Sequence, residues 1–331
     1  MANNSKIYGD VELIKISHGD ALDHYGTWPS PDCIVSDGPY GIGGYDGDLK
    51  NTKGIASWYE PHIRAWSEYA TAKTTLWFWN TEIGWATVHP IIEKYGFVYR
   101  GCNIWNKGMA HVAGRTNTKT LRKFPVSTEV CVHYTKASVF KRTDNGDAIS
   151  MQSWLRSEWE RAGLTLNDAN IACGVKSAAS RKYLTKDRLW YFPPPEMFKK
   201  LAEYANSHGD KNGVPYFSLD GKTVLSGKDW VEKRSVFNCP LGFTNVWDIP
   251  AVRGGERVRA KDKYAHENQK PLSLMTLIVA TSTEPGGVVW EPFGGLCSAS
   301  VAGSRIGRDC YATEIQKDMF LLAQERVRKE N

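Results

Sequence analysis

Two short segments, near opposite ends of the chain, carry residues that could do chemistry. The first is Ile34–Gly41 (IVSDGPYG), where an apolar run is followed at once by a carboxylate, a rigid turn and an aromatic ring. The exocyclic amine of a nucleobase is a poor nucleophile, because its lone pair is delocalised into the ring. Asp37 and the backbone carbonyl of Gly38 could accept hydrogen bonds from such an amine and localise the lone pair. Tyr40, which follows Pro39, could stack on the base. The alternative is an ordinary surface turn, which Asp, Gly and Pro favour.

The second segment is Val288–Leu296 (VVWEPFGGL), an apolar run that opens onto two glycines ahead of a helical pattern. Glycines let the backbone approach a ligand closely, as in nucleotide sites at the carboxyl edge of a parallel sheet. Glu314 follows at the end of the next apolar run, where an acid suits the hydroxyls of a ribose. The alternative is a strand–turn–helix whose glycines serve tight packing, and the position of Glu314 weakens it.

The surrounding sequence predicts the elements that must position these segments. Runs with strand character alternate with helical spacing at both ends of the chain, which is typical of an α/β fold with a mostly parallel sheet covered on both faces. The predicted strands are 11–17, 32–36, 75–79, 97–105, 129–134, 287–291 and 309–313, and the predicted helices are 58–70, 82–95, 272–283, 298–306 and 317–328.

The middle of the chain has a different, mainly helical character. Amphipathic spacing predicts helices over 151–163 and 193–206, and a small hairpin is expected within the irregular stretch 207–235. Between the helices, Asp168–Cys173, a Gly174–Val175 turn and the basic segment Lys176–Leu184 have the outline of a helix-turn-helix. We therefore predict an insert over residues 148–240.

Positive charge is concentrated in two places. The formal net charge is only +6, but residues 100–145 contain nine Lys and Arg residues and two acids. Such a local excess suits a surface that follows phosphates, although a solvated loop explains it equally well. In the loop Gly108–Pro125 the candidate phosphate contacts are Arg115, Lys119, Arg122 and Lys123. In the insert, candidate contacts to bases or phosphates are Lys176, Ser180, Arg181 and Lys182, against the alternative of a solvated basic helix.

The composition argues against several other classes of protein. The seven cysteines are odd in number and include no CxxC pair, so we expect neither a disulfide framework nor a zinc site, and no bound metal. No apolar run approaches the roughly 20 residues of a membrane helix, and the N-terminus lacks the pattern of a secretory signal. We expect a soluble, cytoplasmic protein without a membrane partner.

Taken with their order, the two segments resemble the DPPY-type and FxGxG-type motifs of the β-class amino-methyltransferases, which modify adenine N6 or cytosine N4 in DNA. In that class the catalytic motif precedes the cofactor motif, as it does here. The resemblance covers roughly residues 7–136 and 245–328. Further matches to the family are Gly19–Leu22, Ile104–Lys107, Ser127–Val130, Asn245–Pro250, His266–Pro271 and Gly307–Arg308.

The resemblance implies a Rossmann-like sheet that binds S-adenosylmethionine, with the insert recognising the DNA target. Residues 1–147 would form the catalytic part and residues 241–331 the cofactor-binding part, in a nucleoid-associated enzyme acting on duplex DNA by base flipping. A homodimer and a companion restriction endonuclease stay open as partners. The implied catalytic residues are Asp37, Gly38, Pro39 and Tyr40, and the implied cofactor contacts are Asp37, Lys270, Pro271, Glu291, Phe293, Gly294, Gly295 and Glu314.

The sequence departs from the family pattern at several positions, which leaves three functions open. Gly38 stands where Pro is usual, Leu296–Ser298 stands where Ser-Gly-Thr is common, and Glu291 replaces an Asp. Asp37 favours adenine N6, because family members that act on cytosine N4 usually carry Ser there. The alternatives are a cytosine-N4 enzyme with an unusual acid, and a catalytically inactive DNA-binding protein on a methyltransferase scaffold. RNA as substrate stays open too, although the helix-turn-helix outline suits duplex DNA better.

Overall fold

The chain forms two compact units, residues 1–136 with 235–331 and residues 137–234. The computed structural model describes residues 13–43, 48–112, 119–141, 143, 145–260, 263–264 and 268–329. The second unit begins and ends earlier in the chain than the insert expected over 148–240. It begins earlier because β6 (Phe140–Lys141) pairs with β7 (Ala148–Ile149), and Phe140 is buried in the core of the second unit.

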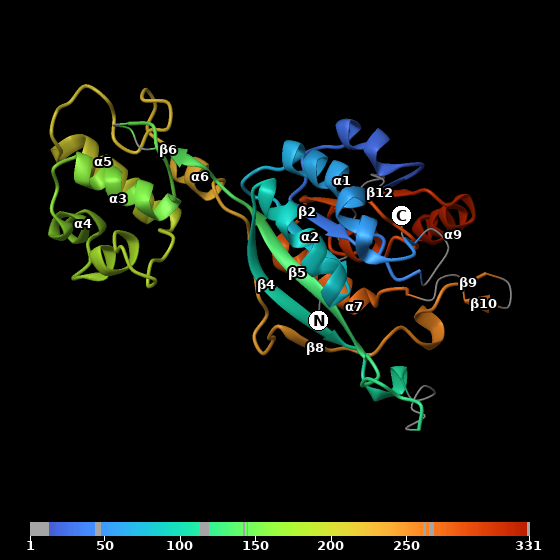
Figure 1. The fold of residues 1–331 in the computed structure, drawn as a ribbon. Helices are drawn as coiled ribbons and strands as arrows, with labels where there is room; N and C mark the ends of the chain where they lie inside the picture. Colours follow the sequence, from blue (N-terminus) through green and yellow to red (C-terminus); the bar gives the residue numbers. More distant parts are fainter. Residues whose placement is uncertain are drawn as a thin grey trace, which may run out of the picture. The chain divides into compact units, whose positions relative to one another are not determined.

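The first unit is built on a sheet that runs through both of its chain segments (Figure 1). Within the described residues, eight strands take the order β1-β12-β11-β2-β3-β5-β4-β8. β5 runs antiparallel to β3 and β4, and the other neighbouring pairs are parallel. The strands are β1 (Ile14–His18), β2 (Cys33–Ser36), β3 (Thr75–Asn80), β4 (Phe97–Asn106), β5 (Thr128–Lys136), β8 (Val246–Asp248), β11 (Val288–Glu291) and β12 (Asp309–Glu314).

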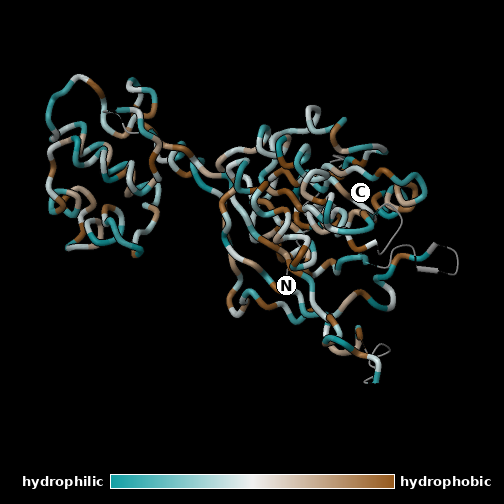
Figure 2. The backbone as a smooth tube through the Cα atoms, viewed as in Figure 1, coloured by the Kyte–Doolittle hydropathy of each residue, from teal (hydrophilic) through white to brown (hydrophobic). Residues whose placement is uncertain are grey.

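Helices cover both faces of this sheet, because side chains of the buried strands alternate between two cores. Cys33 and Val35 of β2 pack in the core that contains α7, α8 and α9, whereas Ile34 between them packs with α1 and α2. In Figure 2 the hydrophobic stretches of the tube lie largely along the strands inside this unit. The helices are α1 (Ile55–Tyr69), α2 (Glu82–Lys94), α7 (Leu272–Ser282), α8 (Ser298–Ser304) and α9 (Lys317–Arg328). The α/β fold with a mostly parallel sheet is confirmed.

Short elements complete the first unit. One-turn helices lie at η1 (Ala21–Asp23), η2 (Tyr25–Thr27), η3 (Thr52–Gly54), η4 (Met109–His111) and η7 (Gly254–Glu256), and β9 (Arg259–Ala260) pairs with β10 (Lys263–Tyr264). Among the described residues, no helix combines the length and the apolar character that crossing a bilayer requires.

The second unit has a hydrophobic core of its own, built from helices and rich in aromatic side chains. Its helices are α3 (Met151–Arg161), α4 (Leu166–Cys173), α5 (Pro195–His208) and α6 (Gly227–Val231). Gly174 ends α4 in the left-handed conformation, with φ 68°, as the turn residue of the expected motif. The expected second helix, 176–184, is only the single π-type turn η6 (Ala179–Tyr183). The stretch 207–235 contains the expected bridge, Ser218 to Val224, and also α6, which the sequence pattern did not predict.

Candidate active site

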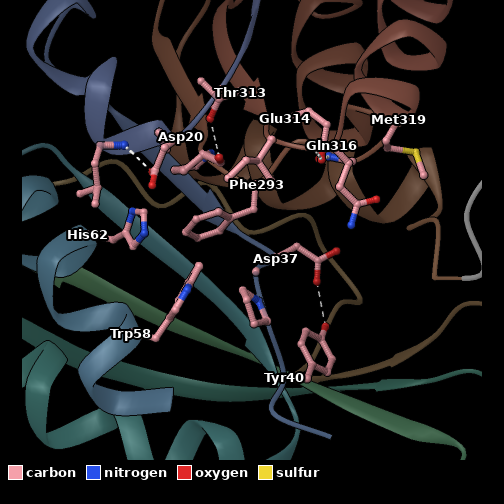
Figure 3. Close-up of a pocket in the computed structure, with 18 of the residues that line it drawn as sticks. Asp20, Asp37, Tyr40, Trp58, His62, Phe293, Thr313, Glu314, Gln316 and Met319 are labelled. Atoms are coloured by element: carbon pink, nitrogen blue, oxygen red, sulfur yellow. Dashed lines mark hydrogen bonds between the residues drawn. The ribbon is translucent and has the colours of Figure 1, made fainter. Parts of the chain in front are cut away.

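A cavity of about 810 Å³ opens at the carboxyl edge of the first unit's sheet. Its walls come from the segments that follow four neighbouring strands, β1, β12, β11 and β2, and from α1 (Figure 3). The volume lies within the roughly 300–1,000 Å³ of small-molecule sites, and the carboxyl edge is where open parallel sheets bind ligands. The cavity brings together eight of the residues singled out in the sequence: Asp37, Gly38, Pro39, Tyr40, Lys270, Phe293, Gly295 and Glu314.

The carboxylate of Asp37 is held by a buried ammonium group. Lys270 Nζ lies 2.7 Å from each oxygen of Asp37, and the side chain of Lys270 is only 4% exposed. The same nitrogen lies 3.1 Å from the hydroxyl of Tyr40 and 5.0 Å from the ring centre of Trp79. Because charge-assisted bonds fix both oxygens, the orientation of Asp37 is set before any ligand binds. Lys270 therefore acts on Asp37 within the cavity wall, a role beyond the cofactor contact that the sequence implied.

A second carboxylate, Glu129, completes the charge balance around Lys270. Its Oε2 lies 3.3 Å from Lys270 Nζ and 3.1 Å from the Tyr40 hydroxyl, and its Oε1 accepts a hydrogen bond from Lys107. Burial alone would raise the pKa of Glu129, but the two ammonium groups together lower it to about 2. Burial alone would lower the pKa of Lys270, but Asp37 and Glu129 raise it. The buried group is thus two anions neutralised by two cations, a condition that buried charges require.

Tyr40 links the two carboxylates through its hydroxyl group. The oxygen lies 2.8 Å from Asp37 Oδ1 and 3.1 Å from Glu129 Oε2. Because the hydroxyl has a single proton, it donates a hydrogen bond to one of these carboxylates at a time. Burial, followed by the charges of Asp37 and Glu129, raises the pKa of Tyr40 well above its usual value. The phenol therefore stays protonated and remains a donor to the carboxylates at neutral pH.

Gly38 is required by packing between the two chemical segments. A Cβ at this position would lie 2.6 Å from Tyr59 Oη and 2.7 Å from Phe293 Cδ2, closer than carbon atoms tolerate. The carbonyl of Pro39 accepts hydrogen bonds from Tyr59 Oη and Asn80 Nδ2, both at 3.1 Å. These bonds fix the turn, so it keeps its shape without a proline at residue 38.

The glycine turn after β11 is tied to the end of β12. Gly295, with φ 52°, donates its backbone N–H to Glu314 Oε2 at 2.8 Å, and burial raises the pKa of Glu314. Gly294 is not part of the cavity lining, and a Cβ there would sit 2.9 Å from both Cys297 Sγ and Thr313 O, so this glycine serves close packing of the turn. Cys297 is fully buried in the core, so its side chain does not intrude on the cavity.

Two of the implied cofactor contacts have supporting positions instead. The Glu291 carboxylate lies behind the turn, where it accepts hydrogen bonds from the N–H groups of Ala299 and Ser300 at the start of α8, at 3.0 and 2.7 Å. Burial raises the pKa of Glu291 to about 7. A carboxylate at a helix N-terminus satisfies amides that have no partner in the helix. Pro271 is buried at the residue before α7. Neither residue lines the cavity, and a cofactor contact at either of them stays a prediction.

The wall includes further polar groups and rings that the sequence pattern did not single out as site residues, among them Asp20, Trp58 and His62. The hydroxyl of Tyr25 lies 3.0 Å from His62 Nδ1 and accepts a hydrogen bond from Trp66 Nε1. Burial lowers the pKa of His62 to about 4, so the ring is neutral at pH 7. Trp58 and His62 project from α1, whose helical spacing carries no signal for a site. Asp20 belongs to a matched family segment and could have been found there.

The candidate phosphate contacts of the loop lie between β4 and β5. Arg122 and Lys123 are exposed, as is Lys119, whereas Arg115 lies outside the described residues. Lys107 at the base of the loop is part of the buried charge group around Glu129. The three described cations therefore lie on a segment whose base is joined to the cavity wall.

The candidates in the second unit divide into two kinds. Lys176, Arg181 and Lys182 are exposed, and Lys182 Nζ lies 5.5 Å from the ring centre of Tyr191. Ser180 instead joins η6 to α4, because its hydroxyl donates to Ser177 O and accepts from Asn170 Nδ2. Ser180 is thus engaged within the unit, and a contact of this side chain to DNA stays a prediction.

The cavity also has the features that a nucleoside ligand with a charged tail needs. It offers the carboxylates of Asp20 and Glu314, the rings of Trp58 and Phe293, and the close backbone approach at Gly295. Within the described part of the chain, no group of three or more His, Cys, Asp or Glu side chains is placed to hold a metal ion.

Comparison with known proteins places these features in one family. The family model N6_N4_Mtase, described as DNA methylase, matches residues 31–325. The DNA adenine methyltransferase YhdJ of Escherichia coli (strain K12) is 32% identical over 84 residues, which are 25% of this chain and 27% of that protein. Matches to the first curated relatives span between 24% and 49% of the length of those proteins.

Solved structures share the fold at low sequence identity. The PvuII DNA methyltransferase (cytosine-N4-specific) aligns with a TM-score of 0.55 and 11% identity, covering 96% of this chain and 91% of that chain. The M1.HpyAVI–SAM complex aligns with a TM-score of 0.53 and 16% identity, covering 95% of this chain and 99% of that chain. The named bases of these proteins differ, adenine for one and cytosine for another.

Proposed function

Because this chain belongs to the N6/N4 DNA methylase family, we propose that it transfers a methyl group from S-adenosylmethionine to the N6 amino group of adenine in duplex DNA. The observation that carries the proposal is the carboxylate of Asp37, fixed in orientation by Lys270 in the wall of a nucleoside-sized cavity. A carboxylate held in this way accepts hydrogen bonds from a target amine without reorganising, which is the condition for electrostatic catalysis.

S-adenosylmethionine supplies an electrophilic methyl group when it is bound. The residues that would hold it are Phe293, Gly295 and Glu314, with Asp20 and His62 at the wall nearest α1 (Figure 3). The Glu314 carboxylate suits the ribose hydroxyls, and the ring of Phe293 offers an apolar contact to the adenine or methionine moiety.

The chain's own residues prepare the target amine. Asp37 accepts one hydrogen bond from the amine and the backbone carbonyl of Gly38 accepts a second, which localises the nitrogen lone pair toward the methyl donor. Tyr40 stacks on the base swung out of the duplex, as enzymes that modify bases require. Lys270 holds the charge of Asp37 throughout, so the carboxylate remains an acceptor while positive charge develops on the amine.

Cytosine N4 is the second candidate target, since a relative of the same fold is named for it. Asp37 favours adenine, because cytosine-N4 members of the family usually carry Ser at this position. The deciding experiment is methylation of plasmid DNA, enzymatic digestion to nucleosides and mass spectrometry. N6-methyl-2′-deoxyadenosine supports the proposal, N4-methyl-2′-deoxycytidine replaces it, and the absence of both supports an inactive DNA-binding protein. Sequencing of the methylated positions gives the recognition site.

We expect the Phe293→Ala variant to bind S-adenosylhomocysteine about 1–3 kcal/mol more weakly, from lost aromatic burial. Glu314→Ala is expected to weaken binding as well, because it removes the acid placed for the ribose. Titration calorimetry measures both variants. Phe243→Ala is the matched control, since this ring is 46% exposed and lies outside the cavity lining. Wild-type affinity in both Phe293→Ala and Glu314→Ala would place the cofactor elsewhere.

Substitutions in the two basic regions are expected to affect DNA binding in different ways. Replacing Lys119, Arg122 and Lys123 with alanine should weaken binding to all duplexes alike, and should reduce the salt dependence by about one unit of slope per lost phosphate contact. Arg181→Ala should instead relax discrimination at one base pair, at a cost of ~1–3 kcal/mol. Competition binding of mapped and scrambled duplexes at several salt concentrations separates the two.

Lys199→Ala is the control for the loss of one exposed cation from the second unit, because this residue lies on α5 and its ammonium group is 3.7 Å from Glu203 in an exposed pair. If Arg181→Ala lowers the affinity for both duplexes equally, η6 does not recognise the target sequence. We propose the second unit, residues 137–234, as the recognition part; it overlaps most of the insert expected over residues 148–240. A homodimer, a companion endonuclease and a place at the nucleoid stay predictions.

A further inference from the structure

The segment between β4 and β5 carries an aromatic side chain that the fold leaves uncovered. We define the β4–β5 arm as the described residues 107–112 and 119–127. We propose that Phe124 on this arm enters the DNA duplex during base flipping and fills the space that the target base leaves. The inference rests on the proposed function, because it assigns a second contact of the same enzyme with its substrate.

The base of the arm is joined to the catalytic carboxylates. β3 is parallel to β2, and β4 has the same direction as β3 because both are antiparallel to β5. The arm, which follows β4, therefore leaves the sheet at the same edge as Asp37, which follows β2. Lys107 donates its backbone N–H to Ser127 O at 2.9 Å, which closes the base, and its ammonium group bonds to Glu129. Glu129 in turn lies 3.1 Å from the Tyr40 hydroxyl. The arm therefore starts from the residues that receive the flipped base.

Phe124 stands out among the apolar side chains of the arm. It is 93% exposed, whereas Met109 is 72% and Val126 is 50% exposed. Pro125 follows it, and a residue before proline is restricted to extended backbone, which limits the ways in which the ring could fold back. A ring this exposed gains free energy when a partner covers it.

The charge of the arm indicates which partner covers the ring. Arg122 and Lys123, which immediately precede Phe124, are exposed, and residues 107–127 include no Asp or Glu. Cations beside an aromatic ring match a nucleic acid, because the cations bind phosphates while the ring stacks on bases. Proteins that unstack a base step insert an apolar side chain in the same way. Duplex DNA with an extruded base is therefore the occupant that fits this surface.

The test uses the full chain and a duplex that carries the site mapped in the methylation assay. Phe124→Ala should bind the fully paired duplex about tenfold more weakly, the effect of losing one base–aromatic stack. On the same duplex with the target adenine mispaired, most of the affinity should return, because a mispaired base costs less to extrude. With 2-aminopurine at the target position, fluorescence of the saturated complex should be lower for Phe124→Ala than for the wild type.

Three variants serve as controls. Phe124→Trp keeps a stacking ring and should restore both affinity and fluorescence. Leu241→Ala removes another fully exposed apolar side chain, 101% exposed, from a different loop and should change neither. Arg122→Ala should weaken both duplexes equally and leave the fluorescence at saturation unchanged, because it removes a phosphate contact and keeps the ring.

The inference is overturned if Phe124→Ala weakens the paired and mispaired duplexes equally, or weakens neither. It is also overturned if sedimentation velocity shows that Phe124→Ala converts a dimer to a monomer, since the ring then belongs to an interface between two copies. Failure of the wild-type chain to methylate any DNA would instead contradict the proposed function, so the two failures are distinguishable.

Discussion

Asp37→Ala should lower the rate of methyl transfer by about 10²–10³-fold, the usual effect of removing a preorganised acceptor at a reacting atom. Asp37 is the side chain of its tetrad that accepts hydrogen bonds as a carboxylate, and Lys270 already fixes both of its oxygens at 2.7 Å. Single-turnover methylation of the mapped duplex measures the effect. Binding of S-adenosylhomocysteine and DNA should stay within a few-fold of wild type, because Phe293 and the arm are unchanged.

Asp37→Asn is the matched variant, because it keeps one acceptor oxygen and the size of the side chain but loses the charge paired with Lys270. We expect Asp37→Asn to retain more activity than Asp37→Ala. Turnover of Asp37→Ala within tenfold of wild type would remove Asp37 from the catalytic step. A large drop in melting temperature would require the comparison to be repeated on Asp37→Asn, whose shape preserves the turn.

The second large effect is expected from Lys270→Met, which should lower the free energy of unfolding by about 3 kcal/mol or more. Methionine fills the space of the lysine stem but leaves Asp37 and Glu129 without their shared cation, and breaking a buried ion pair is strongly destabilising. Urea denaturation followed by tryptophan fluorescence measures the loss. Lys94→Met is the control, because Lys94 pairs with Glu60 at 2.7 Å on the surface, where such pairs contribute less than about 1 kcal/mol.

The pH dependence of stability tests the same buried charges. The pKa of Glu129 falls from its ordinary 4.5 to about 2 in the folded protein, so its contribution is full above 4.5 and is lost as the pH falls toward 2. In Lys270→Met the pKa of Glu129 should rise, so less stability is lost over this range. Lys270 is not the principal counter-ion of the buried carboxylates if Lys270→Met leaves the acid part of the stability–pH curve unchanged. The same conclusion follows if Lys270→Met lowers the free energy of unfolding no more than Lys94→Met does.

Much of the fold could be predicted from local patterns, because buried parallel strands and covering helices leave continuous apolar runs and helical spacing in the sequence. The run 75–79 and strand β3 agree closely, and both chemical segments lie at strand ends as expected. The first limit appears where spacing is short or irregular. α6 has five residues, too few for periodicity, although its capping residues Ser226 and Asp229 were visible. η6 is bonded to α4 through Ser180 and Asn170, a contact that local spacing does not encode.

The site was predictable where a motif places a residue at a strand end, and less so where the role depends on contacts across the fold. Asp37, Phe293 and Glu314 lie in the cavity wall as their positions in the sequence suggested. Glu291 points to the start of α8 instead, because the N–H groups of that helix lie behind the turn. The pairing of Lys270 with Asp37 joins residues more than two hundred positions apart, and no local pattern carries that information.

The chain enters and leaves the second unit at adjacent points, since the Ser138 hydroxyl donates a hydrogen bond to Lys233 O at 2.5 Å. It also has a core of its own, separate from both cores of the sheet unit. A segment with closely spaced ends and an independent core can be replaced by recombination without altering the strands that carry Asp37 or Phe293. The architecture is therefore modular, and chimeras that exchange residues 137–234 between relatives should keep the sheet unit and its cavity.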